Sequence, residues 1–384
     1  MEPVSSKESL DSDEGTCVKN TRTGEEYRYD FASSLVDGIP HPPFIKEKCV
    51  HALQKQLSFR AGDLFVCTYS KCGTSLMEQV VLLLQNNGDA SKMNPLHKNT
   101  YDRNTGVGKI WPEMAVVPHS DTGDANGNGM DNTANADNKK ACMGENKARM
   151  SVNEFDSISN RVMKTHAPTS LFLGKDDTIG ENGFRLAKGI KVIYVTRNPF
   201  DACVSCYYHP KPGVSPESNG CSFAAFAKLW LTKRIEFGGW SNHIAGWRRA
   251  YHENLEHAKQ TQSSPQILWI SYEELVKSPK ASVAKVANFM DIDASSDLVD
   301  AVVEGCKFEK MKESARKTME NGTGGNISHL RKGKIGDWRN HFTSQLKEEF
   351  EEKLKKNLPD ALDVVYDIGD GETWSLGSSS VGNN

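Results

Sequence analysis

Short apolar runs alternate with amphipathic stretches along most of the chain. The run from Asp63 to Thr68 predicts a buried strand, and Thr74 to Gln85, rich in Val and Leu, predicts an apolar helix. The same pattern predicts strands at residues 161–165, 191–196 and 266–270, an amphipathic helix at 281–290, and a charged helix with Leu346, Phe350 and Leu354 on one side. Alternation of strands and helices favours a parallel sheet covered on both faces. We therefore expect an α/β fold formed by a single domain.

Three polar segments interrupt or flank this pattern. Residues 1–25 and 369–384 contain few side chains that could enter a core, and we expect disordered tails there. Residues 120–147 are rich in Asn, Gly and Asp, and we expect a disordered surface insertion. The folded domain is accordingly predicted to span residues 26–368.

Composition narrows the possible functions. The 384 residues carry 47 Lys and Arg against 50 Asp and Glu, a net charge of −3, so nucleic acid is not an expected partner. No apolar run approaches the ~20 residues of a membrane span. The acidic N-terminus lacks the apolar region of a secretory signal, and we expect a cytoplasmic location.

The nine cysteines are typical of a reduced, intracellular protein. Their number is odd, and several, such as Cys67, lie inside apolar runs. Cys203 and Cys206 have the spacing of some metal and redox sites, but no second pair or His cluster accompanies them. We expect no metal.

The stretch "TYSKCGTS", residues 68–75, joins the first buried strand to its helix. It is not a Walker A loop, because that loop requires an earlier Gly and a Lys directly after the second Gly. Backbone N–H groups at a helix N-terminus favour an anion, which Lys71, the hydroxyls of Thr74 and Ser75, and the open backbone of Gly73 would assist. The alternative is an ordinary helix start beside a solvated lysine.

Two further basic stretches could hold a phosphate. Arg197 follows the strand at 191–196, and its planar guanidinium can bind a phosphate through two bonds, with Ser205 following on the next helix. Arg197 could equally pair with Asp201. Arg331 and Lys332 lie in a loop beside a glycine, which alone would be read as a solvated basic loop.

Taken together, "TYSKCGTS", "RNPFDACVS" and "RKGKIGDWRNHFT" resemble, in order and spacing, the cytosolic sulfotransferase family. The resemblance continues through "KTHAP", "EFGGWSNHIAGW", "ISYEELVKSP" and "CKFEKMK", and covers about residues 60–350. It implies a P-loop-kinase-like fold with a central parallel sheet. It also implies transfer of a sulfuryl group from 3′-phosphoadenosine 5′-phosphosulfate, by in-line displacement and without a metal, to a hydroxyl or amine of a small acceptor.

The resemblance also implies roles for individual residues. His166 matches the catalytic base, Lys164 the lysine that assists it, and Lys71 the lysine at the oxygen that bridges phosphate and sulfate. The residues implied to bind the donor are Lys71, Cys72, Gly73, Thr74, Ser75 and Leu76 at the phosphosulfate turn, Arg197, Ser205, Arg331, Lys332 and Gly333 at the 3′-phosphate, and Tyr272, Cys306 and Phe308 near the nucleoside. The acceptor pocket is expected to include residues 100–114, Phe200 and residues 207–223.

Some positions depart from the family pattern. Leu76 replaces a Trp that stacks near the adenine, and Cys306 replaces a Thr at another donor contact. The family's dimerisation motif is altered at Ser344, so we expect a monomer or a weak homodimer. These departures leave open a catalytically weak or inactive nucleotide-binding protein of the same fold. A P-loop kinase does not fit the missing Walker lysine.

Overall fold

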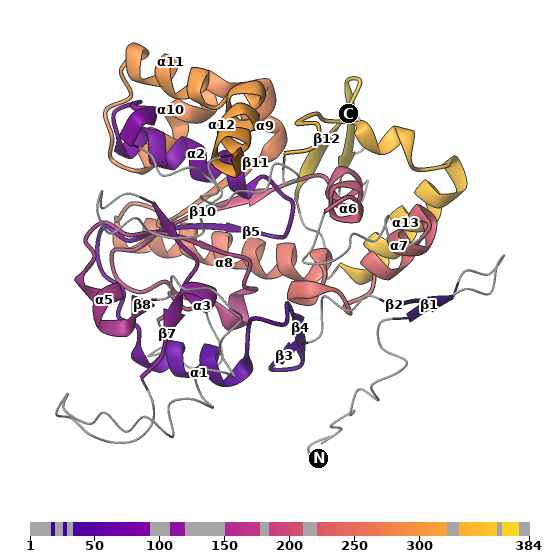
Figure 1. Ribbon diagram of the computed structural model, residues 1–384, viewed down its shortest axis with the longest axis horizontal. Coiled ribbons are helices and arrows are strands. Elements are labelled where there is room, and N and C mark those ends of the chain that lie inside the picture. The colour runs from indigo at the N-terminus through magenta and orange to yellow at the C-terminus, as the bar shows by residue number, and fades with distance from the viewer. Residues whose placement is uncertain are drawn as a thin grey trace.

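A five-stranded sheet with all strands parallel organises the chain. The computed structural model describes residues 17–19, 26–28, 34–92, 108–119, 150–176, 184–209, 221–320, 330–358 and 363–375. The strand order is β11–β10–β5–β9–β6, and β11, β10 and β5 are labelled in the middle of Figure 1. The strands are β5 (Leu64–Thr68), β6 (Lys109–Ile110), β9 (Val162–Thr165), β10 (Lys191–Thr196) and β11 (Ile267–Ser271).

Helices cover both faces of this sheet. Figure 1 shows α2 with α10, α11 and α12 on one side of β5 and β10, and α8 on the other side. The helices are α1 (Glu47–Gln56), α2 (Thr74–Gln85), α3 (Pro112–Ala115), α5 (Val152–Ser157), α6 (Pro199–Tyr207), α7 (Phe223–Trp230), α8 (Trp240–Thr261), α9 (Tyr272–Lys277), α10 (Pro279–Phe289), α11 (Ser296–Gly305), α12 (Phe308–Glu320) and α13 (Ser344–Asn357). None of the helices in the described ranges combines the length and the apolar character needed to cross a membrane.

Alternate side chains along a strand enter two separate hydrophobic cores, one on each face of the sheet. Along β5, Leu64 and Val66 enter the cluster beneath α2 and α10, whereas Phe65 and Cys67 enter the larger cluster on the opposite face. Successive strand residues point to opposite faces, so both must be apolar when helices cover both. This explains why the strands read as continuous apolar runs.

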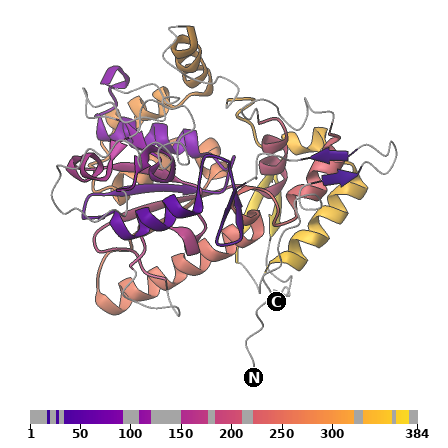
Figure 2. The same cartoon turned by 60° about the horizontal axis from the view of Figure 1, so that its bottom comes forward.

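The described residues also form four small two-stranded sheets. Their strands are β1 (Cys17–Lys19) with β2 (Glu26–Arg28), β3 (Ser34–Val36) with β4 (Ile39–His41), β7 (Val116–Val117) with β8 (Met150–Ser151), and β12 (Val365–Gly369) with β13 (Glu372–Ser375). Figure 2 shows α13, in yellow, on the opposite side of the molecule from α10 and α11. Its buried residues are Leu346, Phe350 and Leu354, as the sequence pattern predicts.

The register of the sheet brings the ends of its strands level. Val195 of β10 pairs with Thr68 of β5, and Cys67 of β5 pairs with Thr165 of β9. The segments that leave these strands therefore begin side by side at one edge. In open α/β sheets, ligands bind at this carboxyl edge.

The structure confirms the α/β fold and contains strands within the two segments expected to be tails. The expected C-terminal tail contains strand β13, whose Trp374 is buried against Phe200, with 5.4 Å between the ring centroids. The expected N-terminal tail contains β1, which pairs with β2. Strands thus lie within both segments that the polar composition predicts to be disordered, and at β13 the packing of Trp374 adds to the strand pairing. The predicted insertion at 120–147 lies outside the described residues.

The expectation of an entirely reduced chain also needs correction. Cys49 forms a disulfide. The cysteines in apolar runs do behave as predicted, since Cys67, Cys203 and Cys206 are free and buried.

Replacing Trp374 with Ala should destabilise the protein. Its side chain is 7% exposed and packs against Phe200 and Tyr366. Loss of a buried Trp typically costs about 3–5 kcal/mol of unfolding free energy, which urea denaturation would measure. Thr373→Ala is the matched control, since Thr373 is exposed on the same strand. Equal stability of the two variants would show that β13 is not part of the folded unit.

Candidate functional site

The turn between β5 and α2 forms the centre of the site. Its backbone closes through a hydrogen bond from Cys72 N to Tyr69 O of 3.2 Å, and α2 begins at Thr74 as predicted. Gly73 has φ 105°, and a Cβ there would lie 2.8 Å from Tyr272, so only glycine fits. The N-terminus of α2, which has 12 residues, thus borders this turn. Such a terminus favours an anion.

Lys71 occupies a strained position in this turn. Its φ of 67° is uncommon for a residue with a side chain. Burial lowers the pKa of Lys71 to about 8. Its Nζ donates to Nδ1 of His209, 3.4 Å away, at the end of α6. His209 belongs to the predicted acceptor segment 207–223, but its contact with Lys71 was not predicted, because no local pattern connects it with the turn.

His166 follows β9 directly and is buried next to the same turn. Its Nδ1 donates to the backbone oxygen of Thr68 at 2.8 Å. With the proton fixed on Nδ1, the neutral ring keeps its lone pair on Nε2. Burial, together with the charge of Lys164, holds the pKa of His166 well below 6.5. His166 is therefore neutral near pH 7 and can accept a proton.

Aromatic rings surround His166. The ring of Trp111 meets it edge-on at 5.3 Å, and Phe237 lies 5.2 Å away. Lys164 Nζ lies 4.3 Å from the centroid of Trp111, and burial lowers the pKa of Lys164 to about 8. Phe237 has φ 67°, a strained value typical of residues that a binding site holds in place. Sequence reasoning missed Phe237, although the two glycines of "EFGGW" indicate an unusual backbone there.

Glu113, from the predicted acceptor segment, is a buried carboxyl that bonds to the residue before His166, a contact that sequence reasoning did not predict. Thr165 Oγ1 donates to Glu113 and accepts from Ala167 N at 2.9 Å. These bonds fix the residues on either side of His166. Burial raises the pKa of Glu113 to about 7. Its Oε2 has no hydrogen-bond partner within the part of the chain that the structure describes. Glu113 therefore steadies the strand end that carries His166.

Arg197 lies on the other side of the turn, at the end of β10. Its guanidinium stacks on the ring of Tyr272 at 4.2 Å, and Nη1 donates to Lys71 O at 3.2 Å. Its Nε is buried and has no partner among the described residues, so one donor is available for a ligand. Ser205 is half-buried further along α6.

The loop that contains Arg331 and Lys332 is held together by its own acidic residue, Asp337. Arg331 Nη2 and Lys332 Nζ each lie 2.6 Å from a carboxylate oxygen of Asp337. Gly333 has φ 65°, and a side chain there would collide with Phe308. Asp337 is a further residue that sequence reasoning missed, because only its place in the fold shows what it binds.

Buried hydrogen bonds attach this loop to α6. Asp201 accepts from Gly336 N at 2.8 Å and from Trp338 N at 3.0 Å. Asn198 caps α6 and donates to Glu273 at 2.8 Å. The basic loop, the start of α6 and the start of α9 thus form one hydrogen-bonded unit next to Arg197.

Not every predicted residue lies where it was expected. Phe200 is fully buried among Trp338, Phe342 and Phe350, so its assignment to the acceptor pocket is wrong. Leu76 and Cys306 are partly buried against the core beneath α2. Trp111, from the predicted acceptor segment, does lie beside His166.

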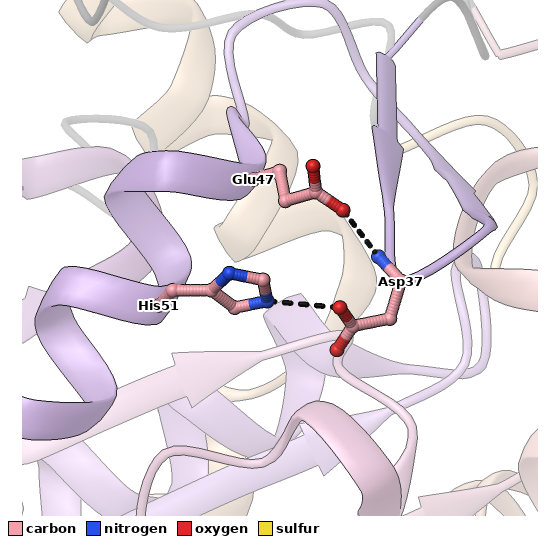
Figure 3. A group of neighbouring side chains, drawn as sticks. All are labelled: Asp37, Glu47 and His51. Atoms are coloured by element: carbon pink, nitrogen blue, oxygen red, sulfur yellow. Dashed lines mark hydrogen bonds and ion pairs between the residues drawn. The ribbon is translucent and has the colours of Figure 1, made fainter.

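A separate polar group lies at the surface, on α1 and the β3–β4 turn. The ligand-type atoms of Asp37, Glu47 and His51 lie within 4.8 Å of one another (Figure 3). They already bond among themselves: His51 Nε2 lies 2.9 Å from Asp37 Oδ1, and Asp37 N donates to Glu47 at 2.9 Å. Exposed acidic groups are common, and we assign no function to this one.

Comparison with known proteins places the chain in a family. The family model described as "Sulfotransferase domain" matches residues 61–361. Mouse (Mus musculus) sulfotransferase 2B1 is 26% identical over 343 residues, covering 87% of this chain and 81% of its own. Human sulfotransferase 1C2 is 27% identical over 319 residues, covering 78% and 85%.

Solved structures share the fold. Mouse sulfotransferase SULT7A1, complexed with PAP, matches with a TM-score of 0.54 and 21% identity over 83% of this chain and 91% of its own. Retinol dehydratase, in a complex with retinol and PAP, matches with a TM-score of 0.56 and 20% identity over 86% and 90%. The family model covers most of the chain and, with the curated relatives, establishes that this chain is a transferase that belongs to the sulfotransferase family.

Proposed function

We propose that this protein transfers the sulfuryl group of 3′-phosphoadenosine 5′-phosphosulfate to a hydroxyl, or an amine, of a small acceptor. The observation that carries the proposal is the hydrogen bond between His166 and the backbone of Thr68. Its Nδ1 is committed to Thr68 O, which leaves Nε2 as a base beside the turn that contains Lys71. A base and an anion-binding turn at one strand edge suit transfer of an anionic group to an acceptor that loses a proton.

The residues present fit the donor. Arg197 offers a buried Nε without a partner among the described residues, and Gly73 leaves the backbone of the turn open. Together with Ser205, Arg331 and Lys332, Arg197 would hold the 3′-phosphate. Lys71 and the turn would hold the phosphosulfate, and Tyr272 and Phe308 would border the base. The solved relatives complexed with PAP support this assignment.

The chemistry of the chain's own residues follows from their protonation states. When bound, the donor supplies the sulfuryl group that the acceptor oxygen receives. His166 takes the proton from that oxygen at Nε2, while Nδ1 stays bonded to Thr68. Lys71 and Lys164 place positive charge where negative charge accumulates during transfer.

For the acceptor, we propose a chemical class and no single compound. Trp111 and Phe237 give the surroundings of His166 an aromatic, apolar character. One solved relative, retinol dehydratase, is complexed with retinol in one structure and with androsterone in another. We therefore propose a sterol or phenol acceptor, in a cytoplasmic protein that is a monomer or a weak homodimer.

A transfer assay tests the proposal directly. The purified protein is incubated with donor labelled in the sulfuryl group and with a panel of sterols, phenols and amines. Label in an acceptor is the expected result. Tight binding of 3′,5′-bisphosphoadenosine without transfer to any acceptor would instead favour an inactive nucleotide-binding protein.

Replacing His166 with Ala should lower turnover by roughly 10²–10⁴-fold, because a positioned base contributes about that much. Donor affinity should stay nearly unchanged. His257→Ala, on α8, is the control and should keep full activity. Near-full turnover of the His166 variant at neutral pH would rule out its role as the base.

The pH dependence of kcat/KM for the donor should have two limbs. His166 must be neutral, and its pKa is lowered, so activity should fall only as pH drops well below 6.5. Lys71 and Lys164 must be protonated, so activity should decline as pH rises through about 8. A profile that stays flat well above pH 8 would contradict the proposed role of the lysines.

Leu76→Trp should tighten binding of 3′,5′-bisphosphoadenosine by about 1–3 kcal/mol, the range for one aromatic stack on a base. Leu76 is only partly buried, which leaves part of its side chain accessible. Leu298→Trp, on α11 in the same cluster, is the control. Calorimetric titration that gave an unchanged or weaker affinity for the Leu76 variant would mean that this position does not face the base or is already filled.

A further inference from the structure

We propose that Asp337 is a positioning residue, which holds Arg331 and Lys332 together to receive a phosphate ester. On this inference, Asp337 determines how strongly the site prefers a nucleotide that carries a 3′-phosphate. The inference rests on the proposed function, because it takes Arg331 and Lys332 to be the residues that meet this phosphate.

The carboxylate of Asp337 contacts four side chains. Arg331 Nη2 lies 2.6 Å from Oδ2, and Lys332 Nζ lies 2.6 Å from Oδ1. Asn340 donates to Oδ1 at 3.0 Å, and His341 Nε2 lies 3.5 Å from Oδ2. One carboxylate thus gathers the two cations and two polar side chains of its own loop.

Burial separates the anchor from the groups it holds. The side chain of Asp337 is 6% exposed, whereas those of Arg331 and Lys332 are 27% and 46% exposed. The carboxylate is inside, and the two cations extend from it toward solvent. Burial acts to raise the pKa of Asp337, but bonds from Lys332 and Arg331 outweigh it and hold the pKa well below its ordinary value. Asp337 therefore stays charged throughout the range in which the protein would work.

Asp337 is itself held in place relative to the rest of the site. The residues on either side of it, Gly336 and Trp338, donate their N–H groups to Asp201 of α6 at 2.8 and 3.0 Å. Arg197 Nη2 donates to the backbone oxygen of Lys334 in the same loop at 3.4 Å. The cations are thus placed relative to Arg197, the third positive group proposed to meet the phosphate.

The same contacts would also fit the opposite role, in which Asp337 competes with a phosphate for the two cations. The numbers of donors argue against this. Arginine has five N–H donors and lysine three, and each spends one on Asp337. Both can therefore bind the carboxylate and a phosphate oxygen at the same time. An exposed cation that is already ordered loses less side-chain entropy when a ligand binds.

The two roles predict opposite effects of Asp337→Asn. This substitution keeps the shape and removes the charge. Calorimetric titration with 3′,5′-bisphosphoadenosine and with adenosine 5′-monophosphate measures the preference for the 3′-phosphate. We expect about tenfold weaker binding of the bisphosphate and less than twofold change for the monophosphate. Asp363→Asn removes a carboxylate that pairs with Arg248 and His252 on α8, and should change neither affinity.

The outcomes separate this inference from the function on which it rests. Unchanged or tighter binding of the bisphosphate by Asp337→Asn would overturn the positioning role, and so would an equal loss for both nucleotides. A wild-type protein that binds both nucleotides alike would instead overturn the proposed function, and the inference with it. If the Asn variant does not fold, Asp337→Glu keeps the charge but displaces the carboxylate, and is expected to lower the same preference about threefold.

Discussion

The register of the parallel sheet is the constraint on which the site depends. Pairing of Val195 with Thr68, and of Cys67 with Thr165, ends three neighbouring strands at one level. The residues that follow these strands are the Lys71 turn, His166 and Arg197. The sheet brings them together although they are far apart in the sequence. A shift of one residue would exchange the two faces of a strand and put side chains of the wrong size into each closely packed core, so packing on both faces fixes this register.

Beyond the strand ends, buried side-chain hydrogen bonds replace the backbone hydrogen bonds of the sheet. The site residues lie on turns and helix starts, where the ladder of backbone hydrogen bonds has ended. Asn198, Asp201 and Glu273 supply replacements, by linking the starts of α6 and α9 to the loop that holds Asp337. Glu273 is buried at this link, and this burial raises its pKa to about 7. Buried polar groups of this kind are satisfied only in one arrangement, and they therefore specify the positions of the side chains around them.

Sequence reasoning succeeded where the signal was local. The strand at Lys191–Thr196 and the helix start at Thr74 follow from apolar periodicity and turn chemistry, and both were predicted at the correct residues. It failed where distant segments decide. The strand around Trp374 exists because it packs against Phe200, and the contacts of Glu113 and Asp337 require the folded chain. Polar composition cannot reveal such partners, because the same residues would be solvated in an isolated segment.

The electrostatics of the site follow from the same geometry. The chain has a net charge of −3, yet the strand edge brings Lys71, Lys164 and Arg197 together. Burial removes water from these cations, and the two lysines respond with pKa values lowered to about 8. A bound anion would reverse that shift, because opposite charge favours the protonated form. On the proposed function, donor binding above neutral pH is then coupled to proton uptake by the lysines. The cost of burying positive charge in the free protein is thereby offset when the negatively charged donor binds.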